Sequence, residues 1–241
     1  MARIAVVTGA AGGMGRAIVA QLARDGLTVI GLDIDEAGLA DIAGTGDVTG
    51  LVVDLTDAEA VADAFVRIGA AHGGIDALVN NAGTCFMSEF PDIPASEFER
   101  QMALNFSGAF FCCQEAVRLM LGRGGVRKIV NISSNGAYNF DVFDPPHYRA
   151  SKAALDTLTK DLARRYAREK IAVNSIAPAM TETPLFGVLS PEVLDKAIAQ
   201  MPHGRAMRPE EIAAWVGFLI SPAGDVCSGN VIILNQGRDV R

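Results

Sequence analysis

The stretch RIAVVTGAAGGMG, residues 3–15, decides the fold. A run of small and β-branched apolar residues enters a turn with glycines at Gly9, Gly13 and Gly15, and a helical pattern follows it. In a strand–turn–helix unit the first glycine permits a tight turn, the second lets backbone approach a pyrophosphate, and the third allows close packing of helix on strand. The first turn of the helix, which holds Met14, offers free N–H groups to the phosphates. The stretch therefore predicts a dinucleotide site.

The rest of the chain repeats this alternation of strand and helix. Apolar runs typical of buried strands lie at 27–33, 50–55, 75–83, 127–134, 171–178 and 230–235. Helical patterns lie at 13–25, 59–71, 96–121, 148–169 and 209–220. Continuous apolar strands separated by helices predict an α/β fold with a parallel sheet covered on both faces. No repeat or linker interrupts the pattern, so residues 1–241 are expected to form a single Rossmann-type, doubly wound domain.

Composition excludes several classes of partner. The chain is 50% hydrophobic and 20% charged, with a net charge of −7. A nucleic-acid partner is therefore not expected, and no apolar run approaches the roughly 20 residues of a membrane span. The cysteines have no metal-ligand spacing and fit small core residues in a reducing compartment, which predicts a cytoplasmic protein without a metal site. They are Cys85, Cys112, Cys113 and Cys227.

An acidic residue ends the second strand. Asp33 lies about 20 residues past the glycines, next to Ile34, where a carboxylate accepts both hydroxyls of an adenosine ribose and repels a 2′-phosphate. The alternative is that Asp33 or Asp35 caps the next helix, and Asp35 suits that role better. The sequence therefore favours NAD over NADP.

Two further strand ends carry candidate cofactor contacts. Asp54, followed by Leu55, ends the predicted third strand and is placed to contact an adenine amino group. The sequence NNAG ends the fourth strand, and its Asn81, Ala82 and Gly83 suit the close passage of a cofactor. Asn–Gly turns also occur for backbone reasons alone, so this motif gains weight only from its position.

A tyrosine and a lysine share one helix face in the stretch HYRASK. Tyr148 and Lys152 are four residues apart, which brings their side chains together in a helix. An ammonium beside a phenol favours the phenolate and lowers the phenol's pKa, which makes it usable as an acid or base. The alternative is a chance surface pair. Against it, Ser133 and Ser134 end the preceding strand at the same sheet edge.

These motifs together resemble the classical short-chain dehydrogenase/reductase (SDR) family over essentially the whole chain. The resemblance rests on TGAAGGMG, NNAG, the serine after the fifth strand and Tyr148-x-x-x-Lys152. It implies a catalytic tetrad of Asn105, Ser134, Tyr148 and Lys152. Tyr148 would exchange a proton with the substrate oxygen, and Lys152 would lower its pKa and bind the nicotinamide ribose. Ser134 would hold the substrate oxygen, and Asn105 would support a proton-relay water.

Two assignments within the resemblance stay open. The spacing from Ser134 to Tyr148 is one residue longer than the family usually has, so Ser133 is a rival for the working hydroxyl. After Pro178 the usual glycine is replaced by Ala179. Thr183, with Thr181 as its rival, falls where the family's threonine contacts the nicotinamide carboxamide. The segment of about 179–205 is expected to form a substrate lid.

The resemblance implies hydride transfer between NAD and an alcohol or ketone. Candidate pocket residues are mostly apolar, which indicates a hydrophobic or aromatic secondary alcohol: Cys85, Phe86, Ser134, Ala137, Tyr138, Phe140, Phe143, Pro146, Met180, Leu185, Phe186 and Leu189. The alternatives are a reductase of the 3-oxoacyl-carrier-protein type and a non-catalytic NAD-binding regulator. The complete tetrad disfavours the regulator. The resemblance also implies a homotetramer.

Overall fold

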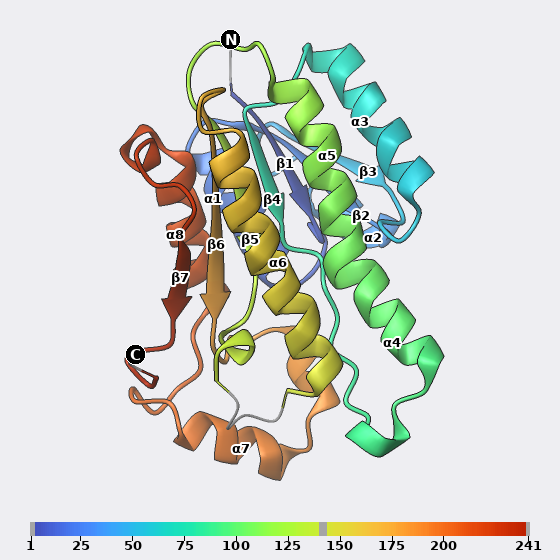
Figure 1. The fold of residues 1–241 in the computed structure, drawn as a ribbon, viewed down its shortest axis with the longest axis vertical. Helices are drawn as coiled ribbons and strands as arrows, with labels where there is room; N and C mark the ends of the chain where they lie inside the picture. The colour runs from blue at the N-terminus through green and yellow to red at the C-terminus, as the bar shows by residue number, and fades with distance from the viewer. Residues whose placement is uncertain (1–2, 140–143, 240–241) are drawn as a thin grey trace.

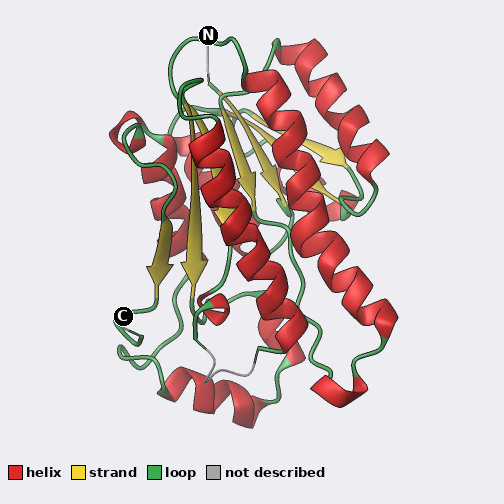
Figure 2. Ribbon diagram, viewed as in Figure 1, coloured by secondary structure: helices red, strands yellow, loops and turns green. Residues whose placement is uncertain are grey.

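A parallel sheet of seven strands forms the centre of the molecule in the computed structural model, which describes residues 3–139 and 144–239. The strand order is β3-β2-β1-β4-β5-β6-β7, and every neighbouring pair is parallel. Helices cover both faces of the sheet (Figure 1, Figure 2). Within the described residues, no helix is long and apolar enough to cross a membrane. The predicted doubly wound fold is confirmed.

The strands are β1 (Ile4–Thr8), β2 (Thr28–Asp33), β3 (Val48–Val52), β4 (Ala77–Asn80), β5 (Arg127–Ile132), β6 (Ile171–Pro178) and β7 (Val231–Leu234). The helices are α1 (Gly13–Arg24), α2 (Glu36–Ile42), α3 (Ala58–His72), α4 (Ala95–Met102), α5 (Ala109–Met120), α6 (Pro146–Arg165), α7 (Pro191–Ala199) and α8 (Pro209–Ile220).

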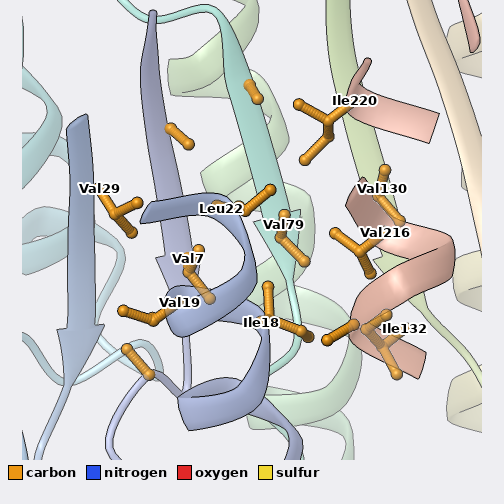
Figure 3. Close-up of a cluster of buried hydrophobic side chains, with 14 of the residues drawn as sticks. Val7, Ile18, Val19, Leu22, Val29, Val79, Val130, Ile132, Val216 and Ile220 are labelled. Atoms are coloured by element: carbon orange, nitrogen blue, oxygen red, sulfur yellow. The ribbon is translucent and has the colours of Figure 1, made fainter. Parts of the chain in front are cut away.

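Two apolar clusters hold the helices to the sheet. On one face, α1 and α8 pack on the central strands through Ile18, Leu22 and Val216, all fully buried (Figure 3). On the other face, side chains of α3 and α5, among them Phe65 and Met120, pack on the same strands. Both faces of each central strand are therefore dry, which is why those strands consist of continuous apolar residues rather than an alternating pattern.

Most predicted elements are present, with differences at their ends. The predicted strand at 50–55 begins earlier and ends at Val52, so Asp54 lies in the loop beyond it. The predicted helix at 96–121 is interrupted by a π-helical turn at Ala103–Gly108. The short helix α7 was not predicted, and α2 was expected only as the helix that Asp35 caps, without bounds. The expected cap at Asp35 is confirmed, because its carboxylate accepts a hydrogen bond from the Gly38 N–H at 3.0 Å.

The glycine turn after β1 leaves no room for side chains. Gly9 has φ +64°, and a Cβ there would lie 2.8 Å from the Ala82 Cα. A Cβ on Gly15 would lie 1.9 Å from the Gly9 carbonyl oxygen, so α1 packs directly on the turn. The predicted roles of these two glycines are thus met by close backbone contact.

We predict that Gly15→Ala lowers the free energy of unfolding by about 1–3 kcal/mol, because the methyl group would force α1 away from the turn. Gly12→Ala is the matched control, since a Cβ on Gly12 meets nothing within 4 Å. Urea unfolding of both variants measures the difference. Equal stability of the two variants would contradict the prediction and show that the turn can shift to accommodate a methyl group at position 15.

Candidate active site

Two adjoining cavities lie beyond the carboxyl ends of the strands. One is a cleft lined by Gly9, Gly12, Gly13, Met14, Asp33, Ile34, Val53, Asp54, Leu55, Thr56, Asn81, Ala82, Gly83, Thr84, Phe86, Arg100, Leu104, Thr183 and Pro184. The other is lined by Met14, Cys85, Met87, Ser133, Ser134, Asn135, Gly136, Asp144, Tyr148, Pro178, Ala179, Met180, Thr181, Thr183, Phe186, Leu189 and Arg238. Met14 and Thr183 line both, so the cavities meet at these side chains.

The cleft contains the predicted dinucleotide contacts. The α1 helix begins over it with no side-chain cap and no acidic residue in its first turn, so the helix dipole favours an anion there. Gly13 has φ +34°, and a Cβ on it would lie 3.2 Å from Thr183. The loop after β6 therefore packs closely on the glycine turn, whose residues Gly9, Gly12 and Gly13 line the cleft.

Asp33 is held in place by the glycine turn. Its Oδ2 accepts from the Ala11 N–H at 2.9 Å and its Oδ1 from the Asp35 N–H at 3.1 Å. Each carboxylate oxygen keeps a further lone pair for a ribose hydroxyl. Ile34 beside it is 70% exposed and forms an apolar wall of the cleft. Asp54 instead accepts from the backbone and hydroxyl of Thr56, at 2.9 and 2.7 Å.

Asn81 ties the strand ends together. Its Nδ2 donates to the carbonyls of Thr8 and Gly9 at 3.1 and 3.0 Å. Its Oδ1 is buried and has no partner within the described part of the chain. An unmatched acceptor at the edge of the cleft requires a donor, which a ribose hydroxyl supplies. The glycine turn, the Asp33 carboxylate and this oxygen therefore fit a nicotinamide dinucleotide, NAD or NADP.

Ser134 and Tyr148 lie together in the second cavity. The Ser134 Oγ accepts from the Gly136 N–H at 3.0 Å, and the Ser134 side chain is near enough to the phenol to lower the pKa of Tyr148. Ser133 also lines this cavity, but its hydroxyl donates to Asp156 at 2.8 Å and is therefore already engaged. The geometry thus favours Ser134 over Ser133 as the hydroxyl next to the phenol.

Lys152 lies under Tyr148. Its Nζ donates to the Ile132 carbonyl at 2.9 Å and lies 5.9 Å from the centre of the Tyr148 ring. Burial lowers the pKa of Lys152 from 10.5 to about 8, against the opposing effects of Asp156 and Cys85. A Cβ on Gly83 would lie 3.3 Å from this Nζ, so the NNAG turn passes directly over the ammonium group.

The expectation that lysine lowers the tyrosine pKa is not met by the protein alone. Burial raises the pKa of Tyr148, and the charges of Asp144 and Cys85 raise it further. The hydrogen bond with Ser134 is the one effect that lowers it. Desolvation outweighs the expected effect of the lysine for two reasons. A buried phenolate loses its hydrating water, and the Lys152 ammonium is directed at a backbone carbonyl rather than at the phenol.

Asn105 lies in the π-helical turn and is fully buried. Its Oδ1 accepts from the Thr84 N–H at 2.8 Å, and its Nδ2 donates to the Thr84 carbonyl at 2.9 Å and the Ser151 hydroxyl at 3.2 Å. The side chain thus fastens the NNAG segment to α6.

A buried carboxylate that the sequence analysis missed connects the site. Asp156 accepts hydrogen bonds from Ser133 and Tyr138, both at 2.8 Å, and from Ser175 at 2.6 Å. Burial raises its pKa, while these hydrogen bonds and Lys152 lower it. The available signal was its spacing, since it lies four residues after Lys152 on the same helix face. Tyr138, expected in the pocket, therefore serves this network.

The substrate cavity is apolar on most sides, as predicted. Of the predicted pocket residues, those that line it are Cys85, Ser134, Met180, Phe186 and Leu189. Phe86 lies in the cofactor cleft instead, under the Arg100 guanidinium at 4.8 Å, while Ala137 and Pro146 are not in the wall. Phe140, Phe143 and the side chain of Leu185 lie outside what the structure describes.

Two charged residues of the cavity were not predicted, Asp144 and Arg238. Burial raises the pKa of Asp144, and Arg149 and Arg238 lower it. The Arg238 guanidinium donates to the Gln200 Oε1 at 2.6 Å. Burial also raises the pKa of Cys85 to about 12, so this thiol stays protonated and is no nucleophile.

The loop after β6 forms the floor between the two cavities. Pro178 lines the substrate side, and Thr181 is buried with its hydroxyl donating to the Ala179 carbonyl at 3.1 Å. Thr183 faces both cavities. Of the two threonines only Thr183 lines both cavities, which favours it over Thr181 for the predicted carboxamide contact. Beyond it, α7 lies across the end of the sheet (Figure 1).

Comparisons with known proteins identify relatives of the whole chain. Residues 9–239 match the family profile described as enoyl-(acyl carrier protein) reductase. The chain is 36% identical to 3-oxoacyl-[acyl-carrier-protein] reductase FabG of Aquifex aeolicus, covering 98% of this chain and 96% of that protein. It is 33% identical to an NAD-dependent glycerol dehydrogenase of Listeria innocua, covering 99% and 94%. A 3-ketoacyl-(acyl-carrier-protein) reductase from Brucella melitensis, solved with NADH, is similar with a TM-score of 0.92 and 28% identity over 99% of this chain and 98% of that one.

The chain therefore belongs to the classical short-chain dehydrogenase/reductase family and is an oxidoreductase of that type.

We predict that Lys152 makes stability rise with pH above its lowered pKa. Between about pH 8 and 10.5 the unfolded chain binds a proton at this lysine that the folded chain has lost, so the unfolding free energy increases with pH there. The difference between wild type and Lys152→Met should rise by about 1 kcal/mol per pH unit in this window. Urea unfolding from pH 7 to 10 measures it. Lys160→Met, which removes an exposed lysine of the same helix, controls for the loss of one charge, and a flat difference for Lys152→Met would contradict the prediction.

Proposed function

We propose that the protein is an NAD-dependent dehydrogenase that interconverts a secondary alcohol, hydrophobic or aromatic, and its ketone. Tyr148 is the acid–base group, and Ser134 holds the substrate oxygen beside it. Lys152 lies beneath the phenol, where its ammonium would bind the nicotinamide ribose, and Asn105 fixes the turn that covers Lys152. When bound, the oxidised nicotinamide supplies the hydride acceptor and a positive charge next to the phenol.

The observation that carries the proposal is the position of the Tyr148–Ser134 pair. Both hydroxyls open into an apolar cavity that meets the dinucleotide cleft at Met14 and Thr183. A carbon atom held at the two hydroxyls is thereby next to the mouth of the cleft. This is the arrangement that hydride transfer coupled to proton transfer requires.

The choice of NAD rests on Asp33. Its carboxylate is fixed against the glycine turn, and Ala11 and Gly12 beside it carry no basic group for a 2′-phosphate. A dianionic phosphate near this carboxylate would be repelled, whereas ribose hydroxyls donate to it. An NAD-dependent relative among the alcohol dehydrogenases supports the same choice.

A second candidate is reduction of a 3-oxoacyl thioester on an acyl carrier protein. The 36% identity to such a reductase favours it. The net charge of −7 weighs against it, because a carrier protein with acidic character would be repelled. Asp33 also weighs against a reductase that works with NADPH.

We predict that wild type forms NADH from hydrophobic secondary alcohols and that Tyr148→Phe loses at least about 100-fold in kcat, because the proton acceptor is gone. The assay uses a panel of aliphatic and aryl alcohols with NAD and NADP in parallel. Calorimetric titration with NAD checks that the variant keeps its cofactor site.

Three outcomes would count against the proposal. Full activity in Tyr148→Phe would remove Tyr148 as the acid–base group. A preference for NADP over NAD would contradict the assignment of Asp33 as the residue that selects NAD. Binding of NAD without oxidation of any alcohol on the panel would favour the regulatory alternative.

We propose a homotetramer in the cytoplasm. Aromatic side chains are exposed on two separate faces: Phe98 and Phe110 on α4 and α5, and Trp215 and Phe218 on α8, all between 39% and 47% exposed. Two apolar faces per chain suit an assembly with two kinds of twofold contact. The four cysteines, none in a disulfide, suit a reducing compartment.

Light scattering should give about four times the mass of one chain. Phe218→Glu should yield dimers, because a charge would replace the apolar contact of one face while the other face remains. A monomeric wild type at micromolar concentration would contradict the assembly.

A further inference from the structure

Asp144 places an unmatched carboxylate beside the reacting groups. Its side chain lines the substrate cavity together with Ser134 and Tyr148. Its backbone carbonyl is occupied, because it accepts from the Arg149 Nε at 2.7 Å. Within residues 3–139 and 144–239, no group donates a hydrogen bond to its carboxylate, and no cation lies within ion-pair distance of it.

The carboxylate is close to Ser134, as Gly136 shows. A Cβ on Gly136 would lie 2.0 Å from the Asp144 Oδ2 and 3.2 Å from the Ser134 Oγ. The two oxygens therefore flank the same glycine, and any larger residue at this position would displace the carboxylate. The absence of a side chain at Gly136 is what lets the acid reach the catalytic hydroxyls.

Asp144 is partly buried and lines the cavity, so a ligand that displaces water from its carboxylate has to offer a hydrogen-bond donor in its place. The negative charge of Asp144 also acts on two neighbours, because it raises the pKa of both Tyr148 and Cys85. Arg238 lines the same cavity but donates to Gln200. The donor that Asp144 lacks is therefore expected to come from the substrate.

We propose that the substrate is a vicinal diol, with the reacting hydroxyl on Tyr148 and Ser134 and the neighbouring hydroxyl donating to Asp144. This inference rests on the proposed dehydrogenase function and narrows it. The apolar side chains Met180, Phe186 and Leu189 contact the carbon skeleton, while Asp144 selects the polar substituent next to the reacting carbon. A 3-oxoacyl thioester offers only acceptors there and would face a carboxylate.

The test compares two alcohols of nearly equal shape. 1-Phenylethane-1,2-diol carries a hydroxyl where 1-phenylpropan-1-ol carries a methyl group. Wild type should oxidise the diol with a kcat/KM at least about tenfold higher, because a site that hydrogen-bonds a substrate hydroxyl rejects the analogue without it. The reverse reaction, with 2-hydroxyacetophenone against propiophenone, should show the same preference.

Variants of Asp144 should remove that preference. Asp144→Leu should favour the mono-alcohol, because the unmatched acceptor is replaced by an apolar group. Asp144→Asn keeps the shape and an acceptor oxygen but loses the charge, and should lower the preference about tenfold. Asp161→Asn, an exposed aspartate of α6, should leave the preference of wild type unchanged.

The outcomes separate this inference from the proposed function. Equal oxidation of both alcohols by wild type, or an unchanged preference in Asp144→Asn and Asp144→Leu, would overturn the role of Asp144 and leave the dehydrogenase standing. Failure of wild type to oxidise either alcohol or any other on the panel would overturn both.

Discussion

The carboxylate of Asp156 is the constraint on which the active site depends. It accepts hydrogen bonds from Ser133 at the end of β5, Ser175 in β6 and Tyr138 in the turn that follows β5. Because Asp156 belongs to α6, these bonds fix the helix of Tyr148 against two strands and one loop at once. A buried carboxylate is costly unless its lone pairs are matched, and here three hydroxyls match them. The Ser133 hydroxyl is thereby engaged by Asp156, which leaves the Ser134 hydroxyl to face the phenol.

The strands and the glycine turn were predictable because each follows from a local rule. A strand dry on both faces must be continuously apolar, and a helix that touches the Gly9 carbonyl must have a glycine at position 15. Asp33 was predictable for the same reason, since it directly ends a strand. These features depend on neighbours within one βα unit.

Other features depend on contacts between distant segments, and local rules do not reveal them. The π-turn at Ala103–Gly108 inserts one residue into a helix without changing its apolar pattern. Tyr138 was expected in the substrate pocket because it lies near the strand end, but its partner is a carboxylate 18 residues away. Asp144 and Ser134 both lie against Gly136, a contact between separate segments that no periodicity encodes. The prediction that Lys152 lowers the pKa of Tyr148 was not met for a similar reason. The spacing of the two residues shows that they are close, but it does not show how far burial removes the phenol from water.

The protonation of Tyr148 links the substrate cavity to the cofactor cleft. In the protein alone, burial and the Asp144 charge favour the neutral phenol, which is the form that donates a proton to a ketone. Oxidation of an alcohol needs the phenolate, and therefore needs more positive charge nearby or less negative charge. A hydroxyl that donates to Asp144 spreads part of its charge onto the substrate, and the cationic form of the cofactor adds positive charge from the other side. Both changes act on the same phenol, so a diol would help to activate the group that takes its own proton. The single charge of Asp144 would therefore have two effects: it would select the substrate, and it would control the protonation of Tyr148.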